Sequence, residues 1–172
     1  MKKKYLMATT LMAGLALSST AFAADGIIHF TGRVVDNVCN VSPTLNVMMG
    51  DITADQLGNI GSSSAEKKFE LVLTDCPASL NGAYVKLDGT RDDKDPTVFQ
   101  LDNSGQPGNA SGIGLQIKDE TSVIEPGAIS QSWPLDPLAT SNTLPFSATY
   151  KVTDKITTGD ANVSVQFSIL YN

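Results

Sequence analysis

The sequence predicts an all-β domain, an antiparallel β-sandwich, on three observations. Short runs of alternating apolar and polar residues recur along the chain, such as FELVLT (69–74) and FSATYKV (146–152). Stretches rich in Gly, Pro and Asn separate these runs, and no segment after residue 23 has the periodicity of an amphipathic helix. Many short strands divided by turn residues are typical of a sandwich rather than of a parallel α/β sheet.

The first 23 residues have the pattern of a secretory signal peptide. Lys2, Lys3 and Lys4 precede a mostly apolar run that ends in Ala21-Phe22-Ala23, an A-x-A cleavage site. A membrane anchor is the alternative, but the apolar run is shorter than the roughly 20 residues that a spanning helix needs. We therefore expect cleavage after residue 23 and export of residues 24–172.

The remaining chain is acidic. Three of the 12 Lys and Arg residues lie in the signal segment, whereas all 18 Asp and Glu residues follow it, so residues 24–172 carry a net charge of 9 − 18 = −9. Such a domain lacks the basic surface that binds nucleic acid, and we expect no nucleic-acid partner.

The chain has two cysteines, Cys39 and Cys76. Disulfides persist in the compartments that exported proteins reach. A metal site is the alternative, but the only histidine is His29, and two thiols alone rarely complete a zinc site. A Cys39–Cys76 bond closing a loop of 37 residues would contribute roughly 3–4 kcal/mol on the chain-entropy estimate.

The expected strands follow one another with turn-rich segments between them, and we expect no helix after the signal segment. These strands are FELVLT (69–74), AYVKLD (83–88), TVFQL (97–101), IGLQI (113–117), FSATYKV (146–152) and NVSVQFSILY (162–171). The turn-rich segments include LGNIGSSS (57–64), DNSGQPGNASG (102–112) and DPLATSNTLP (136–145).

The sequence offers little support for an enzyme, a metal centre or a cofactor site. Nucleophilic catalysis with a histidine would require His29, which sits in an apolar run, and both cysteines are expected to be oxidised. The acidic cluster DDKDP holds Asp92, Asp93 and Asp95 but lacks the spaced ligands and closing glutamate of a calcium loop. We expect this cluster to be a solvated turn, although a pair for glycoside chemistry is the alternative.

Both ends of the exported chain alternate like strands with one buried face. At the front, one face carries Ile28, Phe30, Gly32, Val34, Asp36 and Val38. At the back, one face carries Val163, Val165, Phe167, Ile169 and Tyr171. On periodicity alone, these are the first and last strands of an ordinary sandwich, with Gly32 at a bulge or a close backbone approach.

The order of several segments favours another interpretation, because the exported chain resembles the pilin subunits of chaperone-usher fimbriae, particularly the type 1-like shaft subunits. The segments that carry the resemblance are IIHFTGRVVDNVC (27–39) with its central Gly32, the cysteine pair, GIGLQIKD (112–119), LPFSATY (144–150) and the ending GDANVSVQFSILYN (159–172). That ending has Gly159 fourteenth from the C-terminus and Tyr171 second from it. Thr149 departs from the pattern, since many relatives have a basic residue there.

The resemblance implies an incomplete immunoglobulin-like sandwich that lacks its last strand and is completed by a donor strand from a neighbouring subunit. The donor would be the extension 24–38, through Ile28, Phe30, Gly32, Val34 and Asp36, and the pilin domain would be 39–172. Burying Ile28, Phe30, Val34 and Val38 would contribute on the order of 6–12 kcal/mol as an upper bound. That is comparable with the whole stability of a typical domain.

The resemblance also implies the partners and the location. Before assembly, a periplasmic chaperone would pair with the C-terminal strand, through Gly159, Val163, Val165, Phe167, Ile169, Tyr171 and Asn172. An outer-membrane usher would then add the subunit to a head-to-tail polymer at the cell surface.

A tip adhesin would carry a further domain before Cys39, for which the exported chain has no room, so a shaft subunit is expected and a minor adaptor or terminator is the alternative. The competing class is a self-contained secreted immunoglobulin-like domain that binds a ligand.

Overall fold

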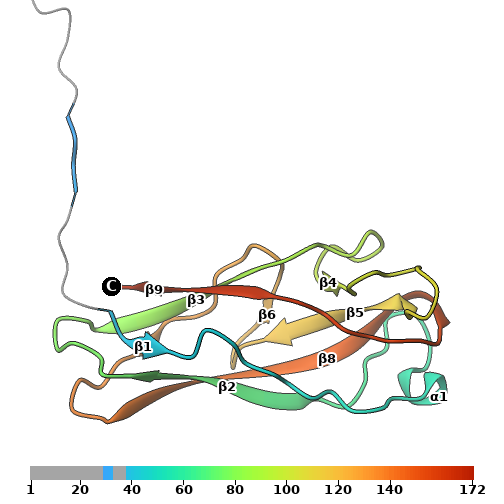
Figure 1. Cartoon of the computed structure of the whole chain (residues 1–172), viewed down its shortest axis with the longest axis horizontal. Helices are drawn as coiled ribbons and strands as arrows, with labels where there is room; N and C mark the ends of the chain where they lie inside the picture. Colours follow the sequence, from blue (N-terminus) through green and yellow to red (C-terminus); the bar gives the residue numbers. More distant parts are fainter. Residues whose placement is uncertain (1–28, 33–37) are drawn as a thin grey trace, which may run out of the picture. The chain divides into compact units, whose positions relative to one another are not determined.

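The computed structural model of the protein describes residues 29–32 and 38–172. The chain divides into two units, residues 1–34 and 35–172, and each is described by itself. Of the first unit the structure describes only residues 29–32, which form neither helix nor strand. The second unit is the predicted β-sandwich, built from nine strands and one short helix among the described residues (Figure 1).

The larger sheet is organised around β8 (Ser141–Thr157), a strand that runs the length of the domain. β2 (Lys67–Thr74) pairs with its first half and β5 (Ser111–Lys118) with its second half. β1 (Asn40–Val41) extends this sheet beyond β2, and β4 (Phe99–Gln100) and β6 (Val123–Ile124) pair with β5. All these pairings are antiparallel, as the short connections of the sequence predict.

The smaller sheet has the order β7-β3-β9 and is also antiparallel. β3 (Gly82–Asp88) lies in its centre, with β7 (Trp133–Pro134) on one side and β9 (Gln166–Tyr171) on the other. No further strand of the described residues pairs with the outer edge of β9. The last strand of the chain is therefore an edge strand.

The core lies between the two sheets, where alternate residues of each strand point inward. The larger sheet contributes Leu71, Leu73, Ile113, Leu115, Ile117, Leu144, Phe146 and Val152, all buried. The smaller sheet contributes Ala83, Val85, Leu87 and Trp133. Phe146 links the two layers, since its ring stacks on Phe69 at 5.4 Å between centroids and meets Trp133 edge-on at 5.0 Å.

One expectation about helices was wrong. Residues 54–57 form a single helical turn, α1 (Ala54–Leu57), before which the Thr53 N–H donates a hydrogen bond to the Gln56 side chain at 2.9 Å. This helix has four residues, of which only Leu57 is buried. A helical pattern of apolar residues needs several turns to be recognised, so the sequence does not predict this one. It is also the only helix among the described residues, and it is too short to cross a membrane.

The extents of three strands also differ from the prediction. β8 begins at Ser141, inside the segment expected to be a turn, because the ladder with β2 starts at Thr74 and Ser141. Pro145 is tolerated there because β5 reaches β8 only from Ser147 onward, so Pro145 has one strand neighbour. β4 has two residues, and β9 starts at Gln166 because β3 pairs with residues 166–171 only.

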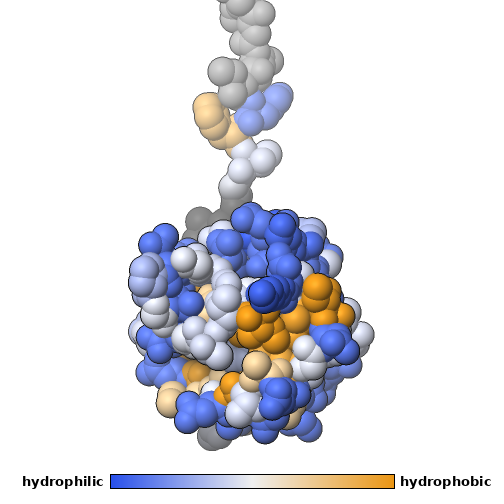
Figure 2. All heavy atoms as spheres, turned by 90° about the vertical axis from the view of Figure 1, so that its right-hand side faces the viewer, coloured by the Kyte–Doolittle hydropathy of each residue, from blue (hydrophilic) through white to orange (hydrophobic). Residues whose placement is uncertain are grey.

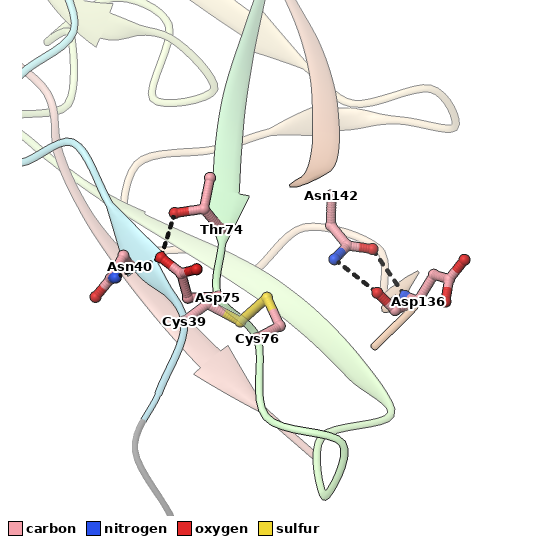
Figure 3. Close-up of a disulfide and its surroundings, with 7 residues drawn as sticks. All are labelled: Cys39, Asn40, Thr74, Asp75, Cys76, Asp136 and Asn142. Carbon is pink, nitrogen blue, oxygen red and sulfur yellow. Dashed lines mark hydrogen bonds between the residues drawn. A yellow bond between two sulfur atoms is a disulfide. The ribbon is translucent and has the colours of Figure 1, made fainter. Parts of the chain in front are cut away.

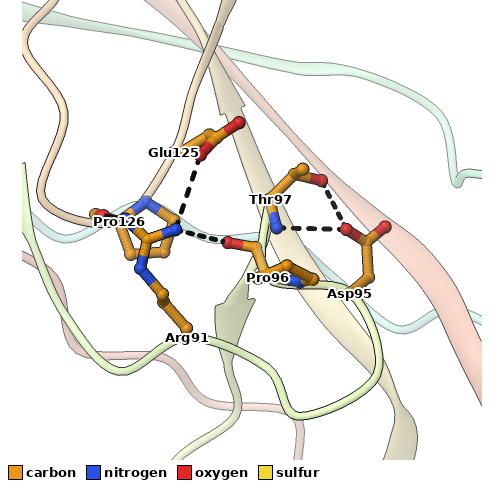
Figure 4. Close-up of polar contacts among 6 residues, drawn as sticks. All are labelled: Arg91, Asp95, Pro96, Thr97, Glu125 and Pro126. Atoms are coloured by element: carbon orange, nitrogen blue, oxygen red, sulfur yellow. Dashed lines mark hydrogen bonds and ion pairs between the residues drawn. The ribbon is translucent and has the colours of Figure 1, made fainter.

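The β3–β4 connection is held in place by the Arg91 and Asp95 side chains (Figure 4). The Arg91 guanidinium donates to the carbonyl oxygens of Pro96 and Pro126 and forms an ion pair with Glu125 at 3.4 Å. Asp95 binds the Lys151 ammonium at 2.7 Å, and this hydrogen bond, together with those from Thr97, lowers the pKa of Asp95. The predicted acidic cluster thus contributes a structural ion pair on the outer face of β8.

Thr149 lies on β8 opposite Gln116 of β5, and is 7% exposed. The position where the sequence departs from the pattern of its relatives is therefore buried within the domain rather than part of its surface.

Asp119, directly after β5, ties the two sheets together. One carboxylate oxygen accepts hydrogen bonds from the Thr121 and Ser122 N–H groups at 2.8 Å, and the other accepts the Gln131 N–H at 2.8 Å, two residues before β7. Burial opposes ionisation, but these hydrogen bonds outweigh it and hold the pKa of Asp119 below its usual value of 3.8.

Replacing Asp119 by Asn should destabilise the domain and change its response to acid. The amide keeps one acceptor oxygen and no charge, so we expect a loss of about 1–3 kcal/mol at pH 7. Because the folded pKa is lowered, the carboxylate stabilises the fold above about pH 4 and this stabilisation is lost as the pH falls below that value. Urea unfolding between pH 7 and pH 2.5 should show a smaller acid loss for Asp119→Asn than for the parent chain. Equal acid losses would contradict this role.

Candidate functional site: an open groove beside the last strand

A groove with a volume of about 1510 Å³ opens between β9 and the segment that follows β1. Residues of both sheets form its floor: Leu71, Leu87, Ile113, Leu115, Ile117, Ala148 and Tyr150. These side chains belong to the core of the sandwich, so the groove is an opening into the core itself. We call it the open groove.

The first lip of the open groove is β9 together with residues 159–165 before it. The alternating face predicted from the sequence lies along this lip: Val163, Val165, Phe167, Ile169 and Tyr171 all line the groove. Each of them is only partly buried, whereas the alternate residues Gln166, Ser168 and Leu170 are exposed. Half-buried side chains beside an unpaired strand edge are the surface to which an added strand binds.

The second lip is the segment 42–53 between β1 and α1, which forms no strand. It contributes the lining residues Leu45, Val47, Met48, Met49 and Ile52. Met48 is 76% exposed and Leu45 is 44% exposed. The apolar run VMM (47–49) between turn residues was the available sequence signal for this lip, which we did not predict.

The two ends of the open groove differ. At one end, which we call the disulfide end, Cys39 is bonded to Cys76, and β1 pairs with β2 through Asn40 and Thr74 (Figure 3). At this end Asp75 accepts hydrogen bonds from the Asn40 and Thr74 side chains. The predicted disulfide is confirmed, and it fixes the start of the domain to the end of β2.

At the other end, which we call the α1 end, α1 and the turn from β8 to β9 flank the open groove (Figure 1). Figure 2 looks at this end of the domain and shows hydrophobic residues gathered in one patch, with hydrophilic residues around it. Hydrophobic surface is therefore exposed at the end of the domain opposite the disulfide.

Two tyrosines line the open groove without adding charge to it. Burial raises the pKa of Tyr150, whose hydroxyl donates a hydrogen bond to the Ala161 carbonyl oxygen in the first lip. Burial also raises the pKa of Tyr171, and a hydrogen bond with the Cys39 backbone opposes this shift only in part. Since both pKa values are raised, both phenols stay neutral at physiological pH and add no charge to the groove.

Gly159 shapes the turn that carries the first lip away from β8. Its φ of 155° is unfavourable for other residues, and a Cβ at this position would lie 2.5 Å from the Asn109 carbonyl carbon and 2.6 Å from the Gly108 oxygen. The next residue, Asp160, exchanges backbone hydrogen bonds with Gly108 and Ala110 at 2.8 and 2.9 Å. Only glycine allows the turn to come this close to residues 108–110.

The C-terminal residue is also fixed to the smaller sheet. The Asn172 N–H donates to the Gly82 oxygen at 3.2 Å, and the Asn81 N–H donates to an Asn172 oxygen at 3.0 Å. The predicted residues of the C-terminal strand from Gly159 to Tyr171 thus lie along the first lip, and Asn172 follows directly after it.

Most of the predicted donor segment falls outside the described residues, including Ile28, Val34 and Asp36. Phe30 and Gly32 are described, in residues 29–32, and Phe30 is exposed. Val38, expected on the donor face, lines the groove of its own domain. The donor role therefore stays a prediction.

Replacing Gly159 by Ala should destabilise the domain by about 1–3 kcal/mol, because the new Cβ has to displace the backbone of residues 108–110. Gly105→Ala is the matched control, since Gly105 also has a positive φ, 76°, but nothing lies within 4 Å of its Cβ position. Chemical denaturation of the oxidised chains should show the larger loss for Gly159→Ala. Equal losses would mean that the close approach does not matter.

The comparisons with known proteins agree with this geometry. The chain is 31% identical over 180 residues to the fimbrial subunit type 1 of Salmonella typhimurium, covering 96% of this chain and 97% of that protein. It is 33% identical to the type-1 fimbrial protein, A chain, of Escherichia coli, with 96% and 97% covered.

Solved structures show the same fold. The antigen and type I fimbria protein of Burkholderia pseudomallei superposes with a TM-score of 0.60 at 30% identity, covering 80% of this chain and 91% of that one. The P pilus rod subunit has a TM-score of 0.65 at 16% identity, covering 79% and 100%. The family model for fimbrial protein matches residues 28–172, which include the whole sandwich and both lips of the open groove. The chain therefore belongs to the fimbrial protein family and is a structural pilin subunit.

Proposed function

We propose that this chain is a shaft subunit of a fimbria that polymerises head-to-tail by donor-strand exchange. The observation that supports this most directly is the open groove beside the unpaired edge of β9, in a chain whose residues 24–38 alternate as a strand that would fill it. The donated segment and the groove are different surfaces, so their contact does not close on itself and produces a filament.

The donor segment would supply what the open groove lacks. Main-chain hydrogen bonds would form with the edge of β9, and Ile28, Phe30 and Val34 would cover the apolar lining. Gly32 would occupy a point where the groove of the neighbour is too shallow for a Cβ. Asp36 would follow at the end of the inserted stretch, before the disulfide that anchors the segment to its own domain.

The same groove accounts for the assembly partners that we propose. A subunit with an uncovered groove exposes an aggregation-prone strand edge, so a periplasmic chaperone strand would cover it until the exchange. The chaperone would pair along Val163–Tyr171, and its basic residues would hold the Asn172 carboxylate. An outer-membrane usher would then mediate the exchange and deliver the polymer to the cell surface, where the fimbria contributes to adhesion.

Export is part of the proposal. Residues 1–23 would be removed as a signal peptide, and the Cys39–Cys76 bond is consistent with an oxidising compartment. An adaptor or terminator subunit at the end of the filament is the alternative position for the chain in the polymer.

The test uses a donor-disabled chain, in which Phe30→Asn and Val34→Asn remove two apolar donor side chains. The peptide ADGIIHFTGRVVDNV, residues 24–38, is added to the oxidised protein at about 100 times its Kd. Ligand binding to the folded state then adds about 2.7 kcal/mol. For a domain of this size the melting temperature should rise by about 5–10 °C.

The control is the same peptide with Gly32→Arg, which should raise the melting temperature little or not at all. A donor-disabled chain that is already stable and is unaffected by the parent peptide would contradict donor-strand exchange. The chain would then be a self-contained domain, and its groove would have another ligand.

A further inference from the structure

The charged residues that line the open groove are all acidic. They are Asp51, Asp102 and Asp160, and within residues 29–32 and 38–172 no Lys, Arg or His lines it. All three lie toward the α1 end: Asp51 precedes α1 by three residues, Asp160 follows the end of β8, and Asp102 follows β4. The α1 end of the groove therefore carries acidic side chains. At the disulfide end the charged groups are the C-terminal carboxylate of Asn172, which follows β9, and Asp75, which already accepts hydrogen bonds from Asn40 and Thr74.

Two of these carboxylates are available to a ligand. Asp102 is already engaged, since it accepts hydrogen bonds from the Ser164 N–H at 3.2 Å and the Ser164 hydroxyl at 2.8 Å. Asp51 and Asp160 are exposed, and neither side chain makes a hydrogen bond or an ion pair within the part of the chain that the structure describes. Asp51 lies on the second lip and Asp160 on the first, so they flank the groove.

The direction of β9 decides which part of an inserted strand reaches these carboxylates. β9 ends at the disulfide end, because Tyr171 contacts the Cys39 backbone and Asn172 bonds to Asn81 and Gly82. Every ladder between the named strands of both sheets is antiparallel. A strand that continues this pattern beside β9 enters at the disulfide end, and its C-terminal half lies at the α1 end.

The C-terminal half of the donor segment contains one cation, Arg33, which is the only Lys or Arg in residues 24–38, and one anion, Asp36, which falls on the same face as Phe30, Gly32 and Val34. In an extended strand, Arg33 points away from the face that carries Phe30, Gly32 and Val34. Its side chain would therefore point toward the rim of the groove rather than into the apolar floor.

We propose that the exposed carboxylates at the α1 end of one subunit, Asp51 and Asp160, attract Arg33 in the donor segment of the next subunit and so favour a donor that carries a cation at this position. This inference rests on the donor-strand function proposed above. The apolar side chains supply most of the affinity and accept any donor with the right alternation. Charged side chains at the rim of the groove add specificity among donor segments, because a donor with a negative charge at this position is repelled.

The test measures binding of the peptide 24–38 and of its Arg33→Glu form to the oxidised donor-disabled full chain. At about 0.02 M salt we expect Arg33→Glu to weaken binding about tenfold, since it replaces attraction by repulsion. At about 0.5 M salt the difference should shrink to less than about threefold, because salt screens exposed charges. In a chain that also carries Asp51→Lys and Asp160→Lys, the preference should reverse, and the Arg33→Glu peptide should bind more tightly.

Glu70→Lys combined with Asp93→Lys is the matched control, because it changes the net charge by the same amount at two exposed residues that do not line the groove. This chain should keep the parent preference for Arg33. Where the charge-reversed chain fails to fold, Asp51→Asn with Asp160→Asn serves instead, and it should abolish the salt-dependent preference.

The outcomes separate this inference from the function on which it rests. If both peptides bind equally at low salt, or if the control chain reverses the preference as well, the Arg33 pairing is wrong while donor-strand exchange stands. If neither peptide binds in any salt, donor-strand exchange is itself wrong, and the pairing is wrong with it.

Discussion

The rest of the structure depends on one constraint: the core of this sandwich has an uncovered side. The inward face of β9 packs against the floor of the open groove, yet Phe167, Ile169 and Tyr171 remain only partly buried because no strand of the domain lies beside them. Each such side chain loses part of the roughly 1.5–3 kcal/mol that full burial would contribute. The described residues of the domain supply no strand for this side, so a covering strand from another subunit, as proposed above, would couple stability to association.

The elements around the groove keep it open and fixed in shape. The disulfide fixes the start of the second lip, and Gly159 and the Tyr150–Ala161 hydrogen bond fix the first lip where it leaves β8. A groove held in shape from both ends does not have to order itself when a strand enters. Binding of a strand would then carry little conformational cost for the groove itself, so more of the free energy of the apolar contacts contributes to affinity.

Much of the fold could be predicted from the sequence because alternation marks strands that bury one face. β2, β3 and β5 lie where that pattern placed them, and the partly buried face of β9 was identified residue by residue. Alternation was not sufficient to predict segments whose conformation depends on pairing with another strand. Ser141–Pro145 has the composition of a turn and becomes a strand because β2 pairs with it, and α1 is too short to have a period.

The candidate site, like the fold, could be predicted from the sequence only in part. The apolar residues of the first lip alternate along the sequence, as in a strand with one buried face, so this lip could be predicted. The second lip, residues 42–53, forms no strand, so no alternating pattern marks it. Asp51 and Asp160 both line the α1 end of the groove, although they are more than 100 residues apart in the sequence. They lie at the same end because β8 runs the length of the domain and ends shortly before Asp160. Charge arrangement of this kind is a property of topology, so it is seen only once the chain is folded.

The polarity of the groove has a consequence for how a filament of such subunits forms. A groove with like ends would accept a donor strand in either direction, and the two directions would place the next subunit at opposite ends of the acceptor. The two ends of this groove differ, since the disulfide and the C-terminal residue lie at one end and α1 lies at the other, so the two directions of insertion would differ in energy. Since each insertion sets the position of the next subunit, a small preference repeated at every contact determines whether the polymer has a single polarity along its length.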